Sequence, residues 1–187
     1  YRIAASNSNA IYQGSPVIPL AAGVIDIVGA AAGGTVGLVG AFYGCEYVSS
    51  TTGETVFSNY YPGSGADSNH PNFPVKAFVY DDPSQLFVIA SDASLTDEAT
   101  ARTHVFANAA FSSGTSGSTS TGMSSAALAV STIDVTNTLN LRIMGIVDDP
   151  ANADFGASGI GVVVRLNNHF NSPNGAIAGG TVSTTGV

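Results

Sequence analysis

LNLRIMGIV, residues 139–147, is the stretch that decides the fold class. Apolar Leu139, Leu141 and Ile143 alternate with an asparagine and an arginine. In a β-strand, successive side chains point to opposite faces, so residues two apart share a face. The stretch therefore predicts a strand with one buried and one wet face, which is typical of antiparallel sheets.

Apolar runs of similar length recur along the chain and are separated by Gly, Pro, Asn and Ser. They are rich in Val, Ile, Phe and Tyr, and short strands at this spacing predict an all-β fold, either a barrel or a sandwich. The runs are 11–18, 24–28, 35–39, 41–48, 55–57, 75–80, 86–90, 126–131, 139–147 and 160–166. We expect at most one short helix, within 94–110, with Ser94 as its N-terminal cap and Asp97 and Glu98 near its positive end.

The 187 residues suit a single domain spanning 1–187. We expect a β core over 10–168, an extended N-terminal arm over 1–9 and a C-terminal tail over 169–187, because neither end can form a core of its own. The run SSGTSGSTSTGMSS, residues 112–125, is polar and flexible and predicts an exposed loop that does not pack.

Charge is scarce and mostly negative. Charged residues make up 10% of the chain, and thirteen Asp and Glu against five Lys and Arg give a formal net charge of −8. Because nucleic-acid affinity comes largely from Lys and Arg, we expect no nucleic-acid partner. An average soluble domain has about 25% charged residues, so the low charge fits a protein whose surface faces a partner in an assembly.

One uncharged stretch, 27–45, has glycine spacings found in packed membrane helices. Glycine and alanine dilute its hydrophobicity and Asp26 precedes it, so we expect no membrane span and predict two buried strands, 24–28 and 35–39, joined by residues 29–34. Cys45, the single cysteine, has no internal disulfide partner and is expected to be a small buried apolar residue.

Motifs for catalysis or metal binding are lacking in the sequence. No Gly-x-Ser-x-Gly occurs, and His70, His104 and His169 stand in three different contexts without zinc-site spacing. We expect no catalytic residue, no cofactor and no enzymatic activity.

Two acidic pairs, Asp81–Asp82 and Asp148–Asp149, each end a strand-like run and precede a proline. Aspartates before proline are typical of turns, in which the carboxylate accepts hydrogen bonds from its own backbone, and this interpretation is favoured. The alternative is that the four aspartates bind calcium or form acid and base pairs.

The segment FSNYYPG, residues 57–63, places three aromatic residues in a predicted loop. Exposed aromatic rings bind sugars or protein partners. The same rings could instead plug one end of a barrel, and the sequence leaves both interpretations open.

Five segments in order resemble a family of tailed-bacteriophage virion proteins, the capsid decoration or cement proteins, which are small, β-rich and encoded near the major capsid protein. The resemblance covers about residues 10–168 and is strongest in the central block, from FYGCEYVSSTTGETVFSNYYPG to FVYDDP. Residues 60–62, Tyr-Tyr-Pro, stand where Tyr-Trp-Pro is expected. The segments are AIYQGSPVI (10–18), VGLVGAFYGCEYVSSTTGETVFSNYYPG (36–63), AFVYDDPSQLFVI (77–89), LRIMGIVDDPAN (141–152) and VVVRLNNH (162–169).

The resemblance implies a structural virion protein on the outer capsid surface. Its partner would be the major capsid protein, bound across neighbouring subunits, and related proteins suggest a homo-oligomer, with a trimer favoured. The second hypothesis is a virion or cell-surface module that binds a glycan or receptor. The third hypothesis is a glycosidase that uses a carboxylate pair. The residues expected to contact the capsid or another subunit are Tyr1, Arg2, Ile3, Tyr60, Tyr61, Phe73 and Phe170.

Overall fold

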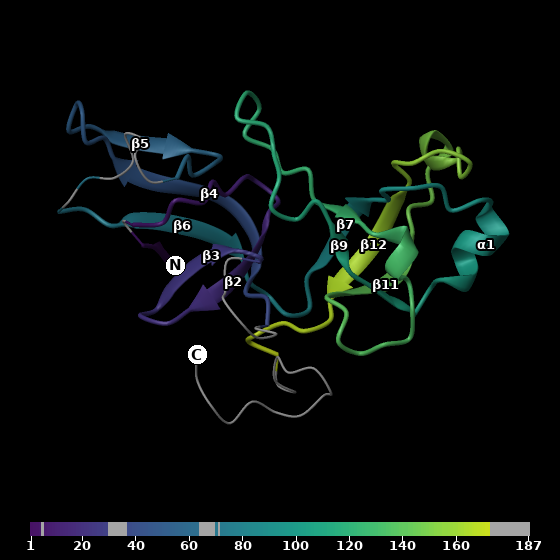
Figure 1. The fold of residues 1–187 in the computed structure, drawn as a ribbon. Coiled ribbons are helices and arrows are strands. Elements are labelled where there is room, and N and C mark those ends of the chain that lie inside the picture. Colours follow the sequence, from purple (N-terminus) through teal and green to yellow (C-terminus); the bar gives the residue numbers. More distant parts are fainter. Residues whose placement is uncertain (5, 30–36, 64–69, 71, 173–187) are drawn as a thin grey trace. The chain divides into compact units, whose positions relative to one another are not determined.

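The computed structural model describes residues 1–4, 6–29, 37–63, 70 and 72–172, and its strands confirm the predicted all-β class (Figure 1). The chain forms two compact units. Among the described residues, unit 1 comprises 1–81 and 114–125, and unit 2 comprises 82–113 and 126–172.

Unit 1 is a small closed barrel. Its sheet has the strand order β2-β3-β1-β6-β4-β5, and β2 also pairs with the start of β4, at Val17 and Gly40. The extra pairing closes five strands into a ring, while β5, at the edge of the sheet, pairs with the end of β4 and extends the wall. The strands are β1 (Arg2–Ile3), β2 (Pro16–Leu20), β3 (Val24–Ile27), β4 (Gly40–Val48), β5 (Thr55–Ser58) and β6 (Val75–Tyr80).

The N-terminal strand β1 lies inside this sheet. The prediction that residues 1–9 form an extended arm is therefore wrong for Arg2 and Ile3. Strand β1 runs between β3 and β6, where Ile3 is opposite both Ile25 and Val75 and is only 1% exposed. A strand of two residues has no periodicity of its own, because its pairing depends on partners far along the chain.

A bulge bends β4 at Tyr43. Phe42 is opposite Val79 and Gly44 is opposite Phe78, so Tyr43 is the extra residue between them. Phe42 points into the core, whereas Tyr43 is exposed. A bulge of this kind bends the strand and increases its twist, which suits the curvature of a five-stranded barrel.

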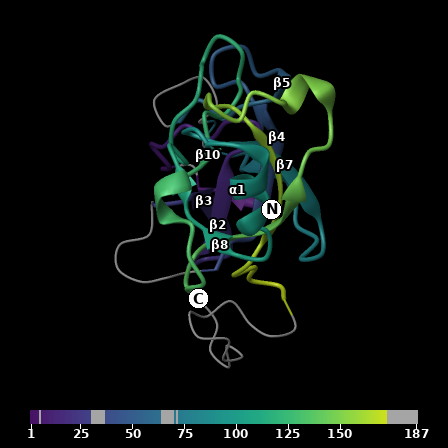
Figure 2. The same ribbon diagram turned by 90° about the vertical axis from the view of Figure 1, so that its right-hand side faces the viewer.

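Unit 2 is built on a four-stranded antiparallel sheet with the order β7-β12-β11-β8. The predicted alternation is confirmed in β11, where Leu141 and Ile143 are buried and Arg142 is half-buried. Helix α1 is seen in front of this sheet in Figure 2. The elements are β7 (Leu86–Ala90), α1 (Glu98–Thr103), β8 (Asn108–Ala109), β9 (Phe111–Ser112), β10 (Ala127–Leu128), η1 (Val130–Thr132), β11 (Leu141–Ile146), η2 (Pro150–Asn152) and β12 (Gly161–Leu166).

The helix is shorter than predicted, and its cap is Asp97 and not Ser94. The Asp97 carboxylate accepts a hydrogen bond from the Thr100 backbone N–H at 2.7 Å. Ser94 instead donates its hydroxyl to the Phe155 carbonyl oxygen at 3.0 Å. An aspartate is favoured at this position because it both accepts the unpaired N–H and places negative charge at the positive end of the helix.

The loop 112–125 is largely exposed, as predicted, but the prediction that it would not pack is wrong. Gln13 N–H donates to the Gly122 carbonyl, and Ser124 N–H donates to the Gln13 carbonyl, both at 2.9 Å. The Asn59 side-chain amide donates to the Thr121 carbonyl at 2.8 Å. Backbone hydrogen bonds hold this segment against unit 1, and such bonds leave no hydrophobic signal in the sequence.

Three predicted segments lie partly outside the described residues. Of the predicted connection 29–34, only residue 29 is described, and of the predicted strand 35–39, only residues 37–39 are. Of the predicted tail 169–187, residues 173–187 lie outside the described part of the chain. Within the described ranges, no helix has the length and hydrophobicity needed to cross a bilayer.

Candidate interaction surface

Four aromatic side chains stand on the outer wall of the unit 1 barrel. We define the aromatic face as Tyr43, Phe57, Phe78 and Tyr80, which come from three neighbouring strands, β4, β5 and β6. Each is about half exposed or more, and Phe57 reaches 73%. Aromatic residues are enriched in protein interfaces, and their exposure on a soluble surface marks a site of interaction when they gather.

Strand register places these side chains on one face. Glu46 is opposite Lys76 on one side and opposite Phe57 on the other, and residues directly opposite in an antiparallel pair share a face. Phe78 and Tyr80 follow Lys76 at intervals of two along β6, so they point the same way.

Two contacts between side chains lie on this face. The rings of Tyr43 and Tyr80 meet edge to face with centroids 5.3 Å apart. Glu46 and Lys76 form an ion pair at 2.9 Å, on the solvent side of the sheet. An aromatic pair of this geometry contributes about 0.5–1.5 kcal/mol beyond its buried area, whereas an exposed ion pair contributes about 0–1 kcal/mol.

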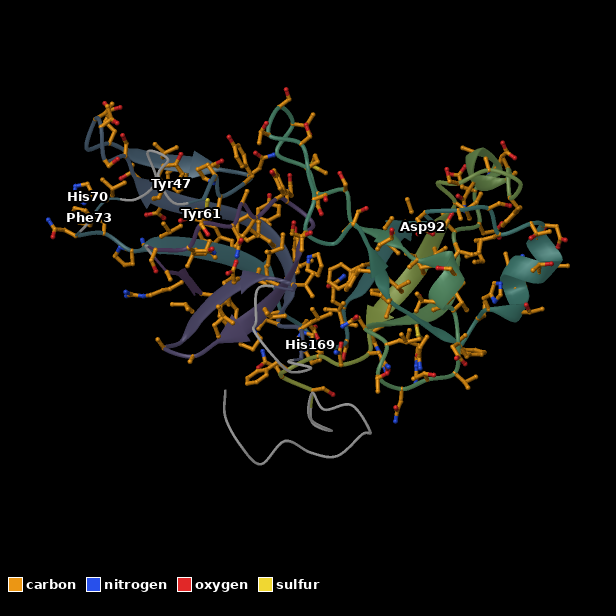
Figure 3. The ribbon with its side chains drawn as sticks, in the orientation of Figure 1. Tyr47, Tyr61, His70, Phe73, Asp92 and His169 are labelled. Carbon is orange, nitrogen blue, oxygen red and sulfur yellow. The ribbon has the colours of Figure 1, made fainter. Side chains whose placement is uncertain are left out.

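Three of the predicted contact residues are accessible in unit 1. Tyr1 is half-exposed and its hydroxyl donates to Asp81 Oδ2 at 2.9 Å. Arg2 is opposite Lys76 and exposed on the same face of the sheet. Phe73 is also half-exposed and packs against His70, with ring centroids 4.9 Å apart, at one end of the strands (Figure 3).

Two predicted contact residues are buried, and their prediction is wrong. Ile3 belongs to the barrel core, as described above, and Tyr61 is fully buried with its hydroxyl donating to the Asn7 carbonyl at 3.1 Å. Tyr61 therefore packs inside unit 1, as the alternative interpretation of 57–63 expected. Tyr60 is half-buried with its ring stacked on Tyr12, and Phe170 is half-buried in unit 2.

One aspartate of each acidic pair stabilises a turn. Asp82 Oδ1 accepts the Ser84 N–H at 2.7 Å, and Asp149 Oδ1 accepts the Ala151 N–H at 2.8 Å at the start of η2. These bonds are the ones that turn chemistry predicts. Within the described residues, no three His, Cys, Asp or Glu side chains are grouped to hold a metal ion.

A groove of about 570 Å³ in unit 2 is lined by both members of the second pair, Asp148 and Asp149, together with the ion pair of Glu98 and Arg102. Half-buried apolar residues, among them Met144, complete its lining. Glu98 is neutralised by Arg102 at 2.7 Å, and one Asp149 oxygen caps η2.

Cys45 is buried in β4, as predicted. Desolvation by burial raises the pKa of its thiol from 9.0 to about 12. The Sγ atom donates to the Tyr60 carbonyl at 3.5 Å. Because a thiolate is the reactive form of cysteine, this thiol is unreactive in the folded protein.

Three members of the aromatic face were not predicted from the sequence. The fourth, Phe57, was predicted both as the last residue of the run 55–57 and as the first of the loop 57–63, and it lies in β5. A signal was present in β6, where Lys76, Phe78 and Tyr80 alternate with apolar residues of the core. Tyr43 gave no such signal, because a bulge shifts the alternation of β4.

Comparison with known proteins adds no family: no family model, no curated protein and no solved structure matches this chain.

Proposed function

We propose that this chain is a structural virion protein that decorates and stabilises a bacteriophage capsid, on the outer surface, by binding across neighbouring subunits of the major capsid protein. The observation that carries the proposal is the aromatic face, where four rings are held on one rigid wall and left in water. Fully burying one such side chain contributes about 1.5–3 kcal/mol, so several rings supply the affinity of a protein interface.

Two further features support this proposal. The chain has only 10% charged residues, so apolar and weakly polar contacts dominate what its surface can offer. Its motifs resemble those of capsid decoration proteins over residues 10–168. Repetition on a symmetric shell multiplies modest individual contacts into tight attachment.

The docking mechanism differs from the one expected from the sequence. Because β1 belongs to the barrel, Tyr1 and Arg2 add to the wall beside the aromatic face and do not reach out as an arm. The proposed contact surface is therefore the aromatic face with Arg2 at its border.

The experiment measures co-sedimentation of the purified chain with shells assembled from the major capsid protein of the bacteriophage that encodes it. Phe57→Ser and Phe78→Ser should each weaken binding about 10-fold to 100-fold, which corresponds to about 1.5–3 kcal/mol. Phe106→Ser is the matched control, because Phe106 is 75% exposed, close to the 73% of Phe57, but lies in unit 2 outside the aromatic face.

Wild-type chain that fails to bind shells would refute the capsid proposal. Equal binding by all three variants would show that the shell is bound through another surface. Copy number separates the glycan or receptor alternative, since a decoration protein occupies hundreds of positions per particle and a receptor-binding module only a few. Oligomeric state in solution, measured by light scattering, tests the proposed trimer.

A further inference from the structure

Two arginines face each other across the central strands of the unit 2 sheet. Arg142 in β11 and Arg165 in β12 are directly opposite in the antiparallel register. Their Cβ atoms in such a pair are about 4.5–5.5 Å apart, and like charges at this position destabilise a sheet. The chain has only five Lys and Arg in total, so two of its few cations are placed in mutual repulsion.

Neither arginine is neutralised within the described part of the chain. The two ion pairs found there are Lys76 with Glu46 and Arg102 with Glu98, so no carboxylate offsets the pair. The chain has thirteen Asp and Glu residues, so acidic side chains that could pair with these arginines are not scarce. Among the residues that the structure describes, no carboxylate therefore compensates the repulsion between the two arginines.

Their hydrogen-bonding groups are partly fixed and partly unused. Arg142 Nε donates to Asn108 Oδ1 at 3.2 Å, and the Asn108 amide is itself held by the Thr136 carbonyl at 3.0 Å. This leaves the two terminal nitrogens of Arg142 as donors. Arg165 Nε is buried and has no hydrogen-bond partner among the described residues. An unsatisfied buried donor costs about 1–3 kcal/mol, more when charged.

The surroundings are apolar and accessible. Arg165 is opposite Leu86 in β7, and the next pair on the same face of these two strands is Val163 with Val88. Leu86 is half-exposed and Val88 is 67% exposed, so a ligand can approach this face. Apolar neighbours lower the local dielectric constant and strengthen a charge-assisted hydrogen bond.

We propose that Arg142 and Arg165 together bind one oxyanion group, a carboxylate or a phosphate, on the outer face of the unit 2 sheet. A guanidinium presents a planar fork of donors that matches the oxygens of either group. One bound oxyanion would remove the repulsion and supply acceptors for both side chains. The site is independent of the aromatic face and of the function proposed above.

The simpler explanation is that the two side chains only cover the sheet with their aliphatic stems, because Arg commonly buries its stem and leaves its head in water. That explanation predicts no more anion affinity at this pair than at any exposed arginine. Arg2, which is exposed on unit 1, provides that comparison within the same molecule.

The test is a titration of the ¹⁵N-labelled full chain, followed through the arginine Nε–Hε signals by NMR at constant ionic strength. One arm adds inorganic phosphate and the other adds acetate. We expect the signals of Arg142 and Arg165 to shift together and saturate with one dissociation constant, while Arg2 and Arg102 do not saturate. In Arg165→Gln the dissociation constant read from Arg142 should rise at least 10-fold, and in Arg2→Gln it should not change.

Saturation with phosphate alone would assign the site to tetrahedral oxyanions, and saturation with acetate would assign it to the carboxylates of a protein partner. Shifts at Arg142 and Arg165 no larger than those at Arg2, or with two different midpoints, would overturn the proposal. The wild-type titration decides this even if Arg165→Gln does not fold.

Discussion

Asp26 binds the segment that contains Asn7 and Asn9 to strand β3 of the barrel. A single substitution at Asp26 measures how much these contacts contribute to the free energy of unfolding. Its carboxylate is buried at 6% exposure and accepts hydrogen bonds from Asn7 Nδ2 at 2.8 Å, Asn9 Nδ2 at 2.9 Å and the Ile27 N–H at 2.7 Å. Hydrogen bonds to charged groups contribute about 1.5–3 kcal/mol each. Asp26→Ala removes both side-chain bonds and leaves the buried Asn7 amide without its acceptor. We expect a loss of about 3–5 kcal/mol, a large part of a typical stability of about 5–15 kcal/mol.

The assay is urea unfolding at neutral pH, followed by circular dichroism, in a double-mutant cycle with Asn7→Ala. The cycle should give a coupling energy of about 1.5–3 kcal/mol between Asp26 and Asn7. Asn9→Ala is the control. Because Asn9 is only half-buried, this substitution should lower the free energy of unfolding by less than Asn7→Ala does. If Asp26→Ala loses less than about 1 kcal/mol, or if the coupling is near zero, the carboxylate does not hold the segment and the reasoning fails.

Three further predictions concern Cys45, the helix cap and two glycines. Burial raises the pKa of the Cys45 thiol from 9.0 to about 12, so between these pH values the thiol ionises in the unfolded chain but not in the folded one. As the pH rises from 9 to 12, the free energy of unfolding of the wild type should therefore fall by up to about 4 kcal/mol relative to that of Cys45→Ala. Urea unfolding at a series of pH values measures this difference. The hydrogen bonds that the Asp97 carboxylate accepts from Thr100 at the helix cap lower its pKa. The contribution of Asp97 to the stability of the fold is therefore present above its usual pKa of 3.8 and is lost as the pH falls through the lower pKa of the folded state. The difference in unfolding free energy between wild type and Asp97→Ala should narrow over that range, and a difference independent of pH would contradict this prediction. Gly40→Ala should strongly lower the melting temperature, because a Cβ would overlap the Tyr80 carbonyl oxygen, whereas Gly145→Ala meets no atom within 4 Å and should melt near wild type.

Strands that form apolar runs of five or more residues between turn residues were predictable from the sequence. The predicted runs 75–80 and 86–90 coincide with β6 and β7, and 160–166 differs from β12 by one residue. In β6 and β12, buried residues alternate with more exposed ones, whereas β7 is apolar throughout, has no fully buried residue and was recognisable as an apolar run alone. The fold class followed from such strands alone.

Elements that depend on distant partners were not predictable in the same way. Strand β1 has two residues, and Tyr61 carries a side chain suited equally to a loop surface or to a core. What buries them is the closure of the barrel, a contact between segments far apart in the chain. For the same reason the opposition of Arg142 and Arg165 could not be read from the sequence, because it depends on register.

Closure of the barrel also determines how the aromatic face would act in the proposed function. The inside of the unit 1 barrel is filled by Ile3, Val17, Ile25, Phe42 and Val75, all nearly inaccessible to water. Interiors are packed at the density of organic crystals, so the outer rings cannot be accommodated by repacking inward. The sheet wall is held by backbone pairing on both sides of β6 and along β4, so the rings cannot turn away from water by a movement of the backbone either. In the proposed function, a capsid subunit that fits this wall covers the rings, and the free energy gained by burying their apolar surface holds the two proteins together.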